Sequence, residues 1–177
     1  MYCDECGHDY LLAYSCKTRY FCLSCHQNRM LAYSEWLEDN LLAPVPHRQY
    51  VFALPKLIQP FFRYRRHYLG QLCRLLAGLL KAGFKAMDPG GQPAFIHYVQ
   101  TFGDLVTFNP HLHALVADSV FLPSGTFQGL PPLSEDTLRE ALRHLVLDFL
   151  CSEGILDTDL AARIRGYSDT RPATPTR

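Results

Sequence analysis

Cysteine residues able to bind a metal ion gather at the start of this 177-residue chain. Five of its seven cysteines lie within the first 25 residues, and four of them form two C-x2-C pairs, Cys3 with Cys6 and Cys22 with Cys25. One pair can grip a metal ion from a tight turn, and two pairs complete a tetrahedral four-sulfur Zn²⁺ site. The pairs predict a structural zinc module, because about 25 residues cannot bury enough apolar surface to fold without the metal.

Other cysteines and histidines have different interpretations. Cys16 is a fifth candidate ligand, and His8 and His26 are alternative ligands that could exchange with a thiol. Disulfides of a secreted domain are the rival interpretation, which the odd number of cysteines and the lack of a secretory signal disfavour. Cys73 and Cys151 stand at apolar helical spacing and are predicted to be core residues.

A second pair of metal-binding side chains lies in "NPHLHALVADSVF", residues 109–121. Successive residues of a strand point to opposite faces, so His111 and His113 would share one face while Leu112, Ala114 and Val116 occupy the other. Two neutral imidazoles at this spacing can bind one divalent metal ion. The alternative is a histidine pair packed in a core or against a partner.

Basic residues are concentrated in the first half of the chain. Residues 1–85 hold 11 Lys and Arg against 6 Asp and Glu, whereas residues 86–177 hold 6 against 11. Much of the excess lies in "FFRYRRHYLG", where Arg63, Arg65 and Arg66 alternate with aromatic rings. Such a mixture suits phosphates and stacked bases; the alternative is the solvated basic face of an amphipathic helix. Lys17, Arg19 and Arg29 are further candidates for DNA contacts.

Hydrophobic periodicity and loop residues predict the elements that would position these side chains. Helices are expected over residues 27–42, 57–85, 134–151 and 156–166. Strands are expected over residues 50–54, 94–103 and 111–122. We expect a bend near Gly70, a link through Asn109 and Pro110, a Pro- and Gly-containing connection over 123–132, and a helix cap at Ser134.

The elements predict an α+β protein with a small zinc module and a helical segment, followed by a domain of strands and helices. Its expected parts are a zinc module with its helix (1–42), a basic helical segment (43–90), the sheet domain (91–167) and a disordered tail (168–177). No apolar run reaches the roughly 18 residues of a membrane span. The first residues also lack the features of a signal peptide, so we expect a cytoplasmic protein.

Together these motifs resemble the rolling-circle transposases of bacterial insertion sequences, the two-tyrosine class of HUH nucleases with an N-terminal transposase zinc-binding domain. The matching stretches are "CDECGHDYLLAYSCKTRYFCLSCHQNRM", "VPHRQYVFALP", "IHYVQTFGDLVTFNPHLHALVAD" and "VFLPSGTF". The resemblance runs from about residue 3 to residue 167.

The resemblance implies that His111 and His113 sit on a central strand of an antiparallel sheet with flanking helices, and that they bind Mg²⁺ or Mn²⁺. The metal polarises a phosphate of single-stranded DNA, which a tyrosine attacks to form a phosphotyrosine. The family usually uses a third metal ligand, for which we select Gln100 on the neighbouring strand, with His97 and Asp104 as rivals. DNA, as single strands or as hairpin ends of a mobile element, is the implied partner, at the bacterial nucleoid.

The sequence departs from the family at both ends. It begins almost at the first zinc cysteine, and it ends where relatives continue into the region of the nucleophilic tyrosines, so we expect a shortened chain with no catalytic tyrosine assigned. Tyr64 and Tyr68 have the four-residue spacing of paired nucleophiles on a predicted helix. They precede the histidine pair, however, and packing or DNA contact is the expected role.

Three functions are compatible with these features. The first is a shortened DNA-binding transposase for rolling-circle transposition. The second is a DNA-binding remnant without catalytic activity. The third is a zinc-ribbon interaction module in which the two histidines are structural, and it differs from the others in lacking salt-dependent DNA binding.

Overall fold

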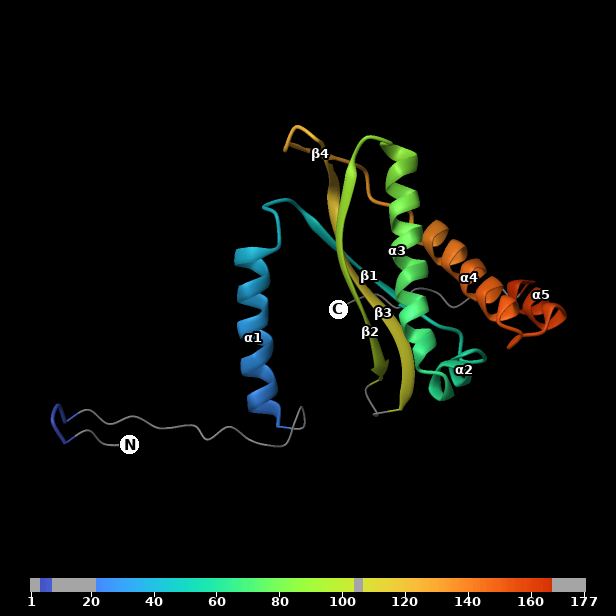
Figure 1. Cartoon of the computed structure of the whole chain (residues 1–177), viewed down its shortest axis with the longest axis horizontal. Coiled ribbons are helices and arrows are strands. Elements are labelled where there is room, and N and C mark those ends of the chain that lie inside the picture. The colour runs from blue at the N-terminus through green and yellow to red at the C-terminus, as the bar shows by residue number, and fades with distance from the viewer. Residues whose placement is uncertain (1–3, 8–21, 104–106, 167–177) are drawn as a thin grey trace. The chain divides into compact units, whose positions relative to one another are not determined.

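The computed structural model describes residues 4–7, 22–103 and 107–166, and it divides the chain into two compact units, Met1–Pro44 and Val45–Arg177 (Figure 1). The first unit contains α1 (Leu23–Asn40). The described part of the second contains β1 (His47–Ala53), α2 (Gln59–Tyr64), α3 (His67–Met87), β2 (Gln92–Phe102), β3 (Phe108–Phe121), β4 (Phe127–Gly129), α4 (Glu135–Ser152) and α5 (Thr158–Gly166). Helices together with an antiparallel sheet confirm the predicted α+β class. The predicted tail at 168–177 lies outside the described residues.

An antiparallel sheet in the order β1-β3-β2 forms the centre of the second unit, and β4 pairs with the end of β3. Strand β3 is therefore central. Its residues Leu112, Ala114 and Val116 are buried beneath the helices, as the alternation predicted. Helix α3 runs along this side of the sheet and contacts β2, while α4 packs on α3 and α5 on α4 (Figure 1).

Apolar stripes attach these helices to the sheet. In α3 every fourth residue is buried, and the stripe consists of Tyr68, Leu72, Leu76, Leu80 and Phe84. This spacing places all five on one side of a helix of 3.6 residues per turn. Helix α4 begins as predicted, because the Ser134 hydroxyl accepts a hydrogen bond from the Thr137 backbone N–H at 3.4 Å.

The predicted bend near Gly70 is wrong. Gly70 lies within α3, and the helical segment instead breaks at Arg65, whose φ of −126° and ψ of 69° lie outside the helical region. A glycine inside a helix costs only about 1 kcal/mol, which burial of the α3 stripe offsets. The mostly helical stretch predicted over 57–85 thus forms two helices, α2 and α3.

Two predicted connections contain strand residues. Asn109 and Pro110, expected in a link, belong to β3. Pro110 is tolerated there because the pairing with β1 ends at His111 and the pairing with β2 has an irregularity between Gln100 and Phe102. The connection predicted over 123–132 contains β4, which returns along β3 after a turn with Gly125 at a φ of +84°.

A tight turn leads into β2. The Asp88 carboxylate accepts hydrogen bonds from the backbone N–H groups of Gly90 and Gly91, at 2.9 and 3.1 Å. Gly91 is buried, and a Cβ atom there would lie 2.4 Å from Val120 Cγ2 of β3. The turn therefore requires a residue without a side chain at this position.

None of the helices in the described ranges has the length and apolar character needed to cross a membrane.

Candidate metal and nucleic-acid site

The face of the sheet opposite α3 carries both histidines of the H-x-H motif. The sheet register places His111 opposite Gln100 of β2, and His113 opposite both Val51 of β1 and Tyr98 of β2. Directly opposed residues in antiparallel strands share a face, so all five side chains lie on the same side. The two imidazole ring centres are 4.8 Å apart.

A backbone carbonyl orients the first imidazole. His111 Nδ1 lies 2.8 Å from the carbonyl oxygen of Asn109. A carbonyl oxygen only accepts hydrogen bonds, so Nδ1 carries the proton and donates. The lone pair of the neutral ring is then on Nε2, and a hydrogen bond of this kind on the other ring nitrogen is typical of metal-binding histidines.

A glutamine on β1 orients the second imidazole. Gln49 Nε2 lies 3.2 Å from His113 Nδ1, whereas His113 Nε2 is buried and has no hydrogen-bond partner among the described residues. Turning the glutamine amide by 180° would place its oxygen against Nδ1, which would then donate. In that arrangement both histidines present an unprotonated Nε2, which is the state that binds a metal ion.

The environment of His113 favours its neutral form. Burial lowers the pKa of His113 below its usual value, and the neighbouring His111 lowers it further. The Tyr98 ring stacks against His113, with ring centres 5.1 Å apart and planes 13° apart. A neutral imidazole held in a stacked position is suited to binding a cation.

The candidates for a third ligand differ in their positions. Gln100 donates its amide N–H to the carbonyl oxygen of Phe102 at 3.2 Å, so its amide oxygen can face a metal ion on the histidine side. His97 lies on the opposite, helix-covered side, at the register position of Ala114. Asp104 is outside the described residues. Within the described ranges no three His, Cys, Asp or Glu side chains form a metal-binding group, so a third ligand from this region must be of another type, such as Gln100.

The described cysteines of the zinc motif stand at a turn and at a helix end. Cys6 closes the turn Asp4–Cys6, and Gly7 follows with a φ of +66°. Cys22 is the N-cap of α1 and Cys25 lies in its first turn, which holds no acidic residue. The backbone N–H groups at a helix start favour negative charge, which suits thiolate ligands. Cys3, Cys16, His8, Lys17 and Arg19 lie outside the described residues.

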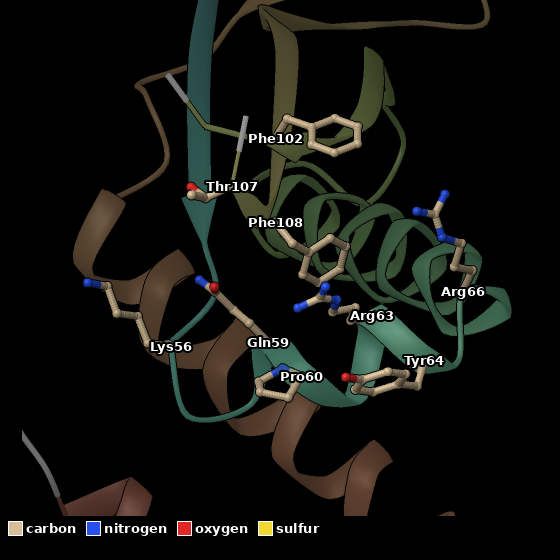
Figure 2. Close-up of a pocket in the computed structure, with 9 residues that line it drawn as sticks. All are labelled: Lys56, Gln59, Pro60, Arg63, Tyr64, Arg66, Phe102, Thr107 and Phe108. Atoms are coloured by element: carbon tan, nitrogen blue, oxygen red, sulfur yellow. The ribbon is translucent and has the colours of Figure 1, made fainter. Parts of the chain in front are cut away.

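The basic–aromatic motif lies at a pocket of about 680 Å³ in the second unit (Figure 2). Its basic side chains are Lys56, Arg63 and Arg66, and its aromatic side chains are Tyr64, Phe102 and Phe108. Arg65, predicted together with its neighbours, does not line this pocket. Arg29 is on α1.

Tyr64 and Tyr68 do not form a pair on one helix. Tyr64 ends α2 and is 80 % exposed, whereas Tyr68 lies in α3 and is buried. The Tyr68 hydroxyl donates to a Glu153 carboxylate oxygen at 3.1 Å, and burial raises the pKa of Tyr68, with a further increase from this hydrogen bond. Tyr68 therefore has a packing role, as expected, and the helical spacing inferred from sequence is wrong because the helix breaks between the two residues.

Several residues near the histidines or in the pocket were not predicted from the sequence. Gln49 was not among the predicted site residues because β1 begins at His47, three residues before the predicted strand. Tyr98 stands two residues before Gln100, and this strand spacing was the available signal for a shared face. Lys56, Phe102 and Phe108 join the pocket through tertiary contacts, for which the sequence holds no local signal.

Comparisons with known proteins agree with the zinc motif. Residues 1–54 match the family described as the transposase zinc-binding domain. The chain is 34% identical over 131 residues to y4qJ of Sinorhizobium fredii, which is described as a transposase; the match covers 70% of this chain and 31% of y4qJ. It is 29% identical over 151 residues to the transposase for insertion sequence element IS801 of Pseudomonas savastanoi pv. phaseolicola, covering 84% and 35% of the two chains. No solved structure matches the chain.

These similarities relate the chain to transposases and identify a transposase zinc-binding domain at its N-terminal end. Most of the chain is thus similar to part of two insertion-sequence or related transposases, and residues 1–54 match the transposase zinc-binding domain. The chain spans about a third of the length of the two transposases compared here.

Proposed function

We propose that this chain binds single-stranded DNA for a rolling-circle transposition reaction, and that the face of its sheet opposite α3 holds the metal ion of the nicking site. The observation that carries this proposal is the placement of His111, His113 and Gln100 on one face, where the buried Nε2 atom of His113 has no hydrogen-bond partner in the described part of the chain. Support also comes from the transposases to which the chain is similar. The single strands or hairpin ends of a mobile element are the proposed substrates.

The residues of the site divide into ligands and positioning residues. His111 and His113 would bind the metal through Nε2, and Gln100 through its amide oxygen. Asn109 and Gln49 hold the two imidazole rings through their Nδ1 atoms. A bound Mg²⁺ or Mn²⁺ ion supplies a Lewis acid that polarises a phosphate oxygen.

The zinc module has a separate role in this proposal. The match over residues 1–54 supports a structural Zn²⁺ ion, and we propose Cys3, Cys6, Cys22 and Cys25 as its ligands, with Cys16 as an alternative. The ion would stabilise a small domain that adds Lys17, Arg19 and Arg29 to the DNA contacts. Arg63, Arg65 and Arg66 of the second unit are proposed to contact phosphates.

The metal site can be tested by titrating Mn²⁺ into zinc-loaded protein and measuring free Mn²⁺ by electron paramagnetic resonance. We expect one weak site, because three protein ligands leave several coordination positions to water. The double variant His111→Ala, His113→Ala should lose it, and Gln49→Leu should weaken it by about 10- to 100-fold, as for other residues that orient metal ligands.

The matched control is His144→Ala, because His144 is exposed on α4. This variant should bind Mn²⁺ as the parent does. Unchanged Mn²⁺ binding in the double histidine variant would contradict the proposal and return the pair to a packing role.

A further inference from the structure

We propose that the pocket lined by α2 and by residues around the β2–β3 connection is a subsite for one unpaired nucleotide of a nucleic-acid strand. The base would stack on the aromatic side chains, and the adjoining phosphate would contact the basic side chains. This inference rests on the proposed DNA-binding function and deepens it by assigning a place to one nucleotide.

The charge of the pocket favours an anion. Lys56, Arg63 and Arg66 contribute three positive charges, and none of them has an acidic partner within 4.0 Å among the described residues. Figure 2 shows Lys56 and Arg66 on opposite sides of the pocket, with Arg63 between them. Cations of like charge around one pocket repel one another, and a phosphate group relieves that repulsion.

The aromatic side chains favour a nucleotide over a simple anion. Tyr64 is 80 % exposed and Phe102 is 46 % exposed, while Phe108 packs partly against the core. The guanidinium carbon of Arg63 lies 5.8 Å from the ring centre of Tyr64, so a cation and a ring adjoin within the pocket. Exposed rings beside cations are a feature of sites that bind single strands.

An unpaired strand fits these rings better than a duplex. The bases of a duplex are stacked on each other, so their faces are not available to protein side chains. A pocket of about 680 Å³ lies within the range of about 300 to 1,000 Å³ that is usual for small-ligand sites. Its size and composition therefore suit a single base with its sugar and phosphate.

A hydrogen-bonded connection joins the pocket to the histidine pair. Gln59 lines the pocket and donates its amide N–H groups to the side-chain oxygen of Asn109 and to the carbonyl oxygen of Leu54, each at 2.9 Å. The backbone carbonyl of the same Asn109 accepts from His111 Nδ1. Phe102 lines the pocket and stands two residues from Gln100 on β2, so the two side chains share a face of that strand, about 7 Å apart along it. One strand can therefore occupy the pocket and reach the proposed metal site.

The experiment separates base contacts from phosphate contacts. Fluorescence anisotropy would measure binding of a short oligothymidylate and of a fully abasic strand of equal length, which keeps the phosphates and lacks the bases. The parent should prefer the oligothymidylate by roughly tenfold, a typical effect of base–aromatic stacking. In the variant Tyr64→Ala, Phe102→Ala this preference should fall by about the same factor.

Two matched controls accompany this comparison. Phe127→Ala removes an aromatic side chain of β4 that is 51 % exposed and outside the pocket, and it should keep the base preference. Arg63→Ala should weaken binding of both strands. Arg65→Ala should weaken binding less, because the Arg65 side chain does not line the pocket. The arginine comparison also tests the pocket independently of the double aromatic variant, should that variant fail to fold.

The outcomes distinguish this proposal from the function on which it rests. Absence of salt-dependent binding of either strand by the parent would overturn the DNA-binding function itself. Salt-dependent binding with an unchanged base preference in the double aromatic variant would overturn only the pocket. Equal losses of affinity in Arg63→Ala and Arg65→Ala would likewise overturn the pocket, because they would indicate a basic surface that has no nucleotide subsite.

Discussion

Two histidines on neighbouring strands show how the side of the sheet decides the role of a residue. Burial lowers the pKa of both His97 and His113. On the helix-covered side, His97 also forms a hydrogen bond with the backbone carbonyl of Cys73, which partly counteracts this decrease in pKa. On the opposite side, His113 keeps a buried Nε2 atom without a partner among the described residues. The first histidine is suited to packing and the second to binding a ligand.

The lowered pKa of His97 predicts that acid destabilises the second unit. Below the ordinary histidine pKa of about 6.5, the unfolded chain binds a proton that the folded chain excludes. The free energy of unfolding therefore falls as the pH decreases below 6.5, with a limiting slope of about 1.4 kcal/mol per pH unit for one proton. The variant His97→Gln should show a smaller fall, measured by urea unfolding at several pH values.

The comparison variant is His144→Gln, which replaces an exposed histidine on α4 and should keep the slope of the parent. Because the slope is compared rather than the stability itself, a general loss of stability in His97→Gln does not affect the test. A slope that stays the same in His97→Gln would show that other groups cause the acid sensitivity.

At the scale of elements, the structure depends on close contact between the turn before β2 and the central strand. The Asp88 carboxylate holds the backbone of this turn, and Gly91 then approaches Val120 of β3. Val120 is fully buried and its branched side chain has little freedom to move away. The turn determines where β2 starts beside β3, and an irregularity between Pro93 and Phe95 then sets the register opposite the histidines.

Replacement of Gly91 by Ala should destabilise the second unit by about 1 to 3 kcal/mol, the usual cost of overpacking. The new Cβ would lie 2.4 Å from Val120 Cγ2 and 2.5 Å from Val120 Cβ. The neighbouring variant Gly90→Ala meets only Asp88 Oδ1 at 3.6 Å, an ordinary contact. Thermal unfolding of the two variants should give a clearly lower midpoint for Gly91→Ala alone, and equal midpoints would contradict the packing argument.

Sequence patterns predicted the elements whose signals are local. The period-two alternation of β3 predicted the shared face of His111 and His113, and Ser134 predicted the start of α4. The break at Arg65 and the strand character of Pro110 could not be predicted, because packing and strand pairing decide both. Residues brought close by pairing, such as Gln49, were missed for the same reason, since register depends on contacts that are distant in sequence.

At the scale of the whole molecule, the two compact units should depend on different sources of stability. The second has an apolar core between sheet and helices. The first begins with the cysteine pairs and contains one described helix, α1, and its stability should depend on zinc. Loss of the metal is therefore expected to affect one unit and leave the other folded.

Metal analysis of purified protein should find one zinc per chain, and Cys25→Ser should lose it. Thermal unfolding of the second unit should keep its midpoint in this variant, because its core contains none of the four proposed ligands. Cys151→Ser is the control, since Cys151 packs against the core of the second unit and should leave the zinc content unchanged. Zinc well below one equivalent in the parent, with the thiols present as disulfides, would refute the zinc module.

The central position of β3 has a consequence for how its histidines meet a ligand. Pairing with β1 extends from His111 to Ala117, and pairing with β2 also spans both histidines. Ladders on both sides hold the backbone around His113, so amide exchange in this stretch should be slow and should occur through unfolding of the second unit. The spacing of the imidazoles is thus preorganised, and a cation that binds them loses little affinity to ordering of the chain.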